Sequence, residues 1–177
     1  MSNALNPRLA AIAGILVMVA LARILPHPPN VTPVMALALF GGAAFADRRL
    51  ALLLPLGAML VSDLLIGLHL QMISVYGALM LGVGIGMLLR GRRRPLPVLG
   101  ATLSASVLFF LITNFGVWLL DGLYPLTWQG LVASYTAAIP FFRNAMLGDL
   151  FFVAVLFGGL ALAERRVLWM REAPAAA

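Results

Sequence analysis

Two carboxylates interrupt otherwise apolar segments of this chain. Asp63 lies within the hydrophobic run 50–68, and Asp149 lies within the run 144–164. A charged side chain inside a membrane span costs roughly 2.5–3.5 kcal/mol on insertion scales, so it usually faces a partner or a wet cavity. Arg23 and Arg143 are the two cations expected near the same depth. We therefore expect the ion pairs Arg23–Asp63 and Arg143–Asp149.

These polar residues allow three kinds of role. A carboxylate paired with an arginine can serve only to fix helix register, and Asn114 and Asn144 can serve only as hydrogen bonds between helices. Asp63 and Asp149 could act as an acid–base pair if they lay about 5–10 Å apart in a cavity. The third role is binding of a solute. We expect binding, and no catalysis.

The stretch 114–149 concentrates polar and aromatic side chains between two hydrophobic segments. Within it, apolar residues of 126–139 recur at helical spacing, which predicts a short helix lying at the membrane interface and ended by Pro140. We expect this helix to roof a pocket above the two aspartates. The tryptophans and tyrosines of the stretch, Trp128 among them, could instead form only an interfacial aromatic belt.

The residues expected to line or cover the pocket come from several segments that gather on one side of the membrane. They are Arg23, Asn30, Asp63, Asn114, Trp118, Tyr124, Tyr135, Arg143, Asn144 and Asp149. No metal site or cofactor is expected, because the chain has no cysteine and its two histidines lack a carboxylate cluster at ligand spacing.

Composition identifies the class of protein that must position these residues. Of the 177 residues, 63% are hydrophobic and 10% are charged, whereas soluble domains have roughly 45–50% apolar and about 25% charged residues. The chain is therefore expected to be an all-α polytopic membrane protein with one domain, 1–177. The net charge of +6 comes from arginines in short clusters between apolar runs, which favours membrane topology over nucleic-acid binding.

Six apolar runs predict six transmembrane helices. Ten of the twelve arginines fall on one side when the spans alternate, so both termini are expected in the cytoplasm. The second run is short for a span, and the first could instead be a signal peptide with small residues at Ala20 and Ala22. The expected spans are 9–25, 33–47, 50–68, 72–90, 96–120 and 144–164.

Four segments resemble a family of uncharacterised bacterial membrane proteins known only as candidate transport proteins. The segments are LPHPPNVTPVMALALFGGAAFADRR, PLGAMLVSDLLIGLH, TNFGVW followed by YP, and AIPFFRNAMLGDLFFVAVLFG, and the likeness covers most of residues 23–164. The resemblance implies a protein of the bacterial cytoplasmic (inner) membrane.

A looser resemblance is to the substrate-binding S component of energy-coupling factor (ECF) transporters. It rests on six spans, a proline- and asparagine-containing loop before a small-residue second helix, and Ser62–Asp63 in the third helix. It implies capture of a vitamin-like solute under lids at 26–33, 69–72 and 121–143, with an ATP-driven transporter module as partner. The chain departs from that pattern in having only Ala10 and Gly14 where a docking face of alanines is usual.

Solute capture from the non-cytoplasmic side is thus the expected function. The alternative is an accessory or scaffold subunit of a larger membrane complex, whose glycine-rich faces at Gly41–Gly42 and at Gly82, Gly84 and Gly86 would contact other proteins.

Overall fold

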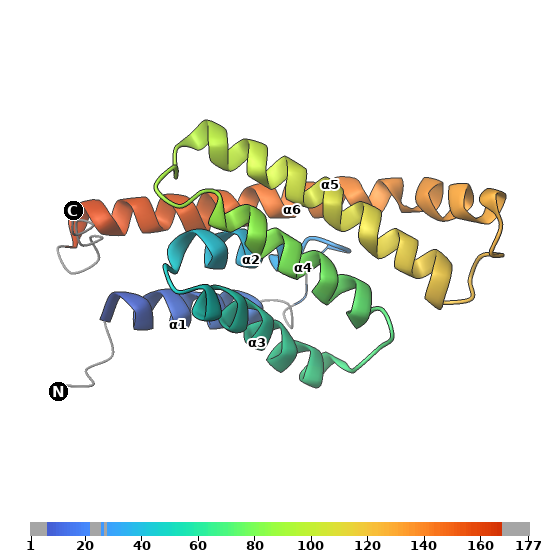
Figure 1. The fold of residues 1–177 in the computed structure, drawn as a ribbon, viewed down its shortest axis with the longest axis horizontal. Helices are drawn as coiled ribbons and strands as arrows, with labels where there is room; N and C mark the ends of the chain where they lie inside the picture. The colour runs from blue at the N-terminus through green and yellow to red at the C-terminus, as the bar shows by residue number, and fades with distance from the viewer. Residues whose placement is uncertain (1–6, 22–25, 27, 168–177) are drawn as a thin grey trace.

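The computed structural model describes residues 7–21, 26 and 28–167, and within that part of the chain it is all-helical, with six helices. They are α1 (Pro7–Leu21), α2 (Val34–Ala44), α3 (Arg48–Ile66), α4 (Met72–Met87), α5 (Pro95–Leu120) and α6 (Trp128–Arg166). The helices run roughly along one long axis, and α1 begins at the same end of the molecule at which α6 ends (Figure 1).

Three helices are long and apolar enough to cross a membrane: α3, α5 and α6. The other three are apolar but shorter, and the described part of α1 ends at Leu21. The expectation of six full spans is therefore met only in part. The largest departure is the second run, expected as a span over 33–47, because its helix has only 11 residues. At 1.5 Å per residue such a helix is about 16 Å long, which is half a bilayer core.

Helix α2 lies at the centre of the bundle. All 11 of its residues are buried, and it contacts each of the other five helices, α4 most extensively (Figure 1). Its sequence, VMALALFGGAA, has no polar face, and a helix that is apolar all round is one that is enclosed on every side. Because protein rather than lipid surrounds it, α2 does not need the length of a span.

Glycines allow the closest helix contacts in this core. A Cβ at Gly42 or Gly86 would overlap backbone atoms of the facing helix. The backbones of α2 and α4 are therefore in direct contact at these glycines. Gly41 packs against Pro55 of α3, and Gly82 packs against Met35 of α2. These four glycines serve contacts within the chain, which removes them from the protein-binding faces expected for an accessory subunit.

Helix α6 differs from the expected short interfacial helix followed by a separate span. It is one helix of 39 residues that starts after the N-cap Thr127, whose side chain accepts a hydrogen bond from Gly130 N–H at 3.2 Å, and it continues through Pro140. A proline removes only one backbone hydrogen bond, and apolar surroundings let such a helix continue. The prediction that the helix ends at Pro140 is therefore wrong.

The N-terminal part of α6 and the C-terminal part of α5 project together beyond the ends of α3 and α4 (Figure 1). The chain between them, 121–127, is held by the Trp118 indole, which donates to the Pro125 carbonyl at 3.0 Å. Gln71 of the α3–α4 connection donates to Asp121 at 2.8 Å and so ties this projecting pair to the shorter helices.

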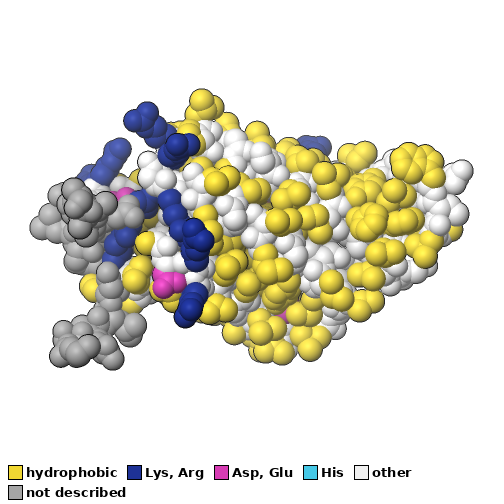
Figure 2. Space-filling model, in the orientation of Figure 1, with side chains coloured by type: hydrophobic (Ala, Val, Ile, Leu, Met, Phe, Trp, Pro, Cys, Tyr) yellow, Lys and Arg dark blue, Asp and Glu magenta, His cyan; other side chains and the backbone are white. Residues whose placement is uncertain are grey.

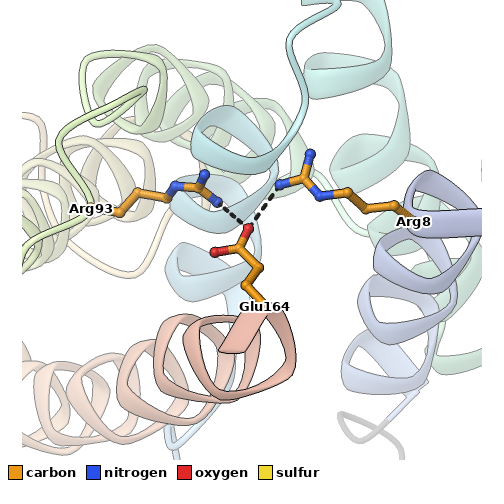
Figure 3. Close-up of polar contacts among 3 residues, drawn as sticks. All are labelled: Arg8, Arg93 and Glu164. Carbon is orange, nitrogen blue, oxygen red and sulfur yellow. Dashed lines mark hydrogen bonds and ion pairs between the residues drawn. The ribbon is translucent and has the colours of Figure 1, made fainter. Parts of the chain in front are cut away.

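Arginine side chains gather at the opposite end of the molecule (Figure 2). There Glu164 of α6 accepts from Arg8 of α1 at 2.9 Å and from Arg93, which precedes α5, at 3.3 Å (Figure 3). Arg90 donates to the carbonyl of Gly42 at 3.0 Å, one of the last four carbonyls of α2, which have no partner within that helix. One end of the bundle is thus polar and cationic, while the sides are largely apolar (Figure 2).

Candidate functional site

A cavity of about 470 Å³ lies where the projecting part of α5 and α6 meets the shorter elements. Its walls come from five places in the chain: the segment before α2, the start of α4, the C-terminal half of α5, the 121–127 connection and the N-terminal half of α6. This volume falls within the range of sites for small molecules, roughly 300–1,000 Å³.

Two helical stripes with the same spacing form the long walls of the cavity. Each takes positions i, i+3, i+4, i+7, i+8 and i+11, which is one face of an α-helix. The stripe on α5 is Ser106, Phe109, Phe110, Thr113, Asn114 and Val117, and the stripe on α6 is Ser134, Ala137, Ala138, Phe141, Phe142 and Ala145. Phe110 and Phe142 join the two walls with ring centroids 4.6 Å apart. The α6 stripe runs past Pro140, so the continuity of that helix is what creates the wall.

The segment before α2 forms a third wall and is held in place by α6. Asn30, with a φ of 62°, lines the cavity, as does Thr32. Asn144 donates to the carbonyl of Pro29 at 3.2 Å. One turn further along α6, Gly148 lies beside Val31, whose Cα would be 3.1 Å from an added Cβ. The absence of a side chain at Gly148 therefore lets this segment lie against α6.

A buried carboxylate lies behind the cavity wall at Ser106. Ser106, a lining residue, donates to Asp149 at 2.8 Å, and Asp149 is 4% exposed. The same carboxylate accepts hydrogen bonds from the backbone N–H groups of Met35 and Ala36. These are the second and third residues of α2, whose N–H groups have no partner within that helix. Asp149 thus caps α2 from another helix, with its carboxyl group at the positive end of the α2 dipole.

The structure brings together only some of the residues expected to bind a solute. Asn30, Asn114 and Tyr124 line the cavity. Asn144 and Asp149 do not line it but hold the residues that do. In addition, each of the three expected lid segments reaches the cavity, through residues such as Asn30, Gln71 and Tyr124.

Other expected residues lie elsewhere. Asp63 is buried and accepts from Tyr76 at 2.8 Å, away from the cavity lining. Tyr135 donates to the Leu111 carbonyl at 2.6 Å and lines a separate shallow groove with Trp128. Trp118 supports the 121–127 connection rather than the cavity. Arg23, and with it the expected pair Arg23–Asp63, lies outside the described residues.

The expected pair Arg143–Asp149 is wrong. Arg143 is exposed, and Asp149 is buried against Ser106 and the start of α2. The two residues are six positions apart on one helix, which is about 240° around its axis, so they face different directions. No ion pair between them is present in the part of the chain that the structure describes.

Sequence reasoning missed most of the apolar wall and several polar positions. It overlooked Thr113 and Ser134, and it gave no role to Phe109 and Phe110. A signal was available, because Ser106, Thr113 and Asn114 share one helical face in an otherwise apolar run. Polar residues aligned in this way within a membrane helix indicate a face turned toward protein or a cavity.

Fold and site together define the class: an all-helical protein in which three of the described helices can cross a membrane, with a cavity near one end. More particularly, the chain belongs to a family of unknown function, DUF6580, whose family model matches residues 3–175. It matches no curated protein and no solved structure.

Proposed function

We propose that this protein captures a small solute in the cavity between α5 and α6, from the non-cytoplasmic side of a bacterial cytoplasmic membrane. The observation that carries the proposal is the cavity itself, about 470 Å³ in volume and walled by segments far apart in the sequence. A concave, mostly apolar site with a few convergent polar groups is the usual form of a small-molecule site.

The two ends of the molecule support the proposed placement in the membrane. Arginines favour the cytoplasmic side of membrane proteins, and here Arg8, Arg48, Arg49, the 90–94 segment and Arg165–Arg166 belong to one end (Figures 1 and 2). In this placement both termini are cytoplasmic, all six helices enter or cross the bilayer, and the cavity opens toward the other side.

Capture and release require the segments over the cavity to move. Two of the hydrogen bonds that hold those segments are exposed: Asn144 to the Pro29 carbonyl at 3.2 Å and Gln71 to Asp121 at 2.8 Å. Exposed hydrogen bonds lower the cost of local opening. In a binding protein resembling the S component of ECF transporters, opening would admit the solute, and release to the cytoplasm would use an ATP-driven module or a gradient, because the chain carries no nucleotide-binding motif.

Native mass spectrometry of the gently solubilised protein tests this function against the alternative of an accessory subunit. If the protein captures a solute, some or all of the purified chains should retain one small molecule each. Release of intact large subunits in fixed stoichiometry, with no small molecule on the chain, would contradict capture and support the accessory role.

A further inference from the structure

The cavity has no charged side chain among the described residues that line it. Its polar groups are amides and hydroxyls, and four of its lining residues are phenylalanines. A charged solute moved from water into such a site would lose hydration without gaining an opposite charge. The lining therefore discriminates against ions of either sign.

The nearest carboxylates do not change this conclusion. Asp149 lies behind Ser106 and is occupied by that hydroxyl and by two N–H groups of α2. Asp121, at the outer rim, accepts from Gln71 at 2.8 Å. Neither aspartate lines the cavity, so neither is placed to neutralise a cation held between the phenylalanine rings.

The polar atoms left for a solute form a small set of donors and acceptors. The Asn114 amide nitrogen donates to the Phe110 carbonyl at 2.9 Å, which leaves the Asn114 Oδ1 as an acceptor. Tyr124 lines the same cavity, and its hydroxyl makes no hydrogen bond within the described residues. Both side chains are half-buried, and a polar group in a cavity wall favours a ligand that satisfies it over one that leaves it unpaired.

The geometry points to an uncharged, ring-containing solute that carries both a hydrogen-bond donor and an acceptor, for which Asn114 and Tyr124 are specificity-determining residues. The ring would lie against the aromatic wall that contains Phe110 and Phe142, whose rings are inclined at 39°. The donor of the solute would bond to Asn114 Oδ1, and its acceptor to the Tyr124 hydroxyl. This inference rests on the proposed capture function and names the class of solute.

Three probes of the same shape test the class: benzamide, benzoate and benzylamine, which are neutral, anionic and cationic at pH 7. Their dissociation constants are measured on the full chain in nanodiscs by ligand-observed NMR, with empty nanodiscs as the blank. Benzamide is expected to bind at least about tenfold more tightly than either ion. Equal or tighter binding of an ion would overturn the neutral class, and no binding by any probe would overturn the ring-containing class. Neither result contradicts capture, which the mass spectrometry tests separately.

Asn114→Asp is a second test, in which the expected result is tighter binding of one probe rather than a loss of binding. The new carboxylate is expected to tighten benzylamine binding at least about tenfold and to leave benzoate the weakest probe. Ser104→Ala, on an exposed position of α5 outside the cavity, is the matched control and is expected to stay within about twofold of the parent chain. If Asn114→Asp binds the three probes as the parent chain does, Asn114 does not face the solute and the assignment fails.

Discussion

The hydroxyl of Ser106 on α5 donates a 2.8 Å hydrogen bond to the carboxylate of Asp149 on α6. Because that carboxylate also accepts from the N–H groups of Met35 and Ala36, one buried side chain links three helices. At the other end of α2, Arg90 donates to the Gly42 carbonyl. The central helix therefore has an acidic side chain at its N-terminus and a guanidinium group near its C-terminus, the arrangement that its dipole favours.

Replacing Asp149 should destabilise the fold. In Asp149→Ala, the two N–H groups of α2 and the Ser106 hydroxyl lose their buried acceptor, which is expected to lower the free energy of unfolding by about 1–3 kcal/mol. Reversible unfolding in mixed micelles measures the change. Asp121→Ala, which removes an exposed carboxylate bonded to Gln71, is the control and should change stability by less than about 1 kcal/mol. Equal stability of the two variants would show that Asp149 does not cap α2.

The close approach of α2 and α4 gives a second stability prediction. In Gly86→Ala, the new Cβ would overlap the backbone of Leu39, so the helices must separate, at a cost of about 1–3 kcal/mol. Gly84→Ala, two residues away, adds a methyl group to open space and should be neutral or slightly stabilising. The pair is compared by the same unfolding measurement. A loss at Gly84 as large as that at Gly86 would mean that the α2–α4 contact does not govern the effect.

The fold could be predicted from the sequence where local patterns decide it. Apolar runs between arginine clusters gave the helices, and Asp149 was recognised as a residue that needs a partner. Its real partners could not be found in this way, because the N–H groups that it accepts belong to every residue and leave no mark on the sequence. The nearest cation along the chain, Arg143, was chosen instead, although helical spacing turns it away from Asp149.

The burial of α2 and the continuity of α6 depend on tertiary contacts. Helix α2 was recognised as short, and its lack of any polar face is a signal that it is enclosed. Pro140 would end a helix in water, but here residues on both sides of it, Ala138 and Phe141, line one continuous wall. The stripe of polar residues on α5 was visible in the sequence, whereas the facing stripe on α6 is mostly alanine and phenylalanine and cannot be told from ordinary core.

The placement in the membrane can be tested with single cysteines, because the chain has none of its own. In intact cells, a membrane-impermeant maleimide should label Gln129→Cys, at the start of α6, and should label Arg92→Cys only after the membrane is permeabilised. Both positions are exposed, and they lie at opposite ends of the molecule. A difference in labelling therefore reports the side of the membrane and not the burial of the residue. Labelling of Arg92→Cys in intact cells would reverse the proposed orientation.

The most direct test of solute capture compares two tryptophan variants on α6. Ala137 lines the cavity and Ala133, one turn earlier, does not, and both are exposed. Ala137→Trp should fill the cavity, whereas Ala133→Trp should leave it open. Small molecules are extracted from equal amounts of the parent chain and the two variants and are quantified by mass spectrometry. The capture account predicts a compound that the parent chain and Ala133→Trp retain and Ala137→Trp lacks. Identical extracts from all three proteins would contradict it.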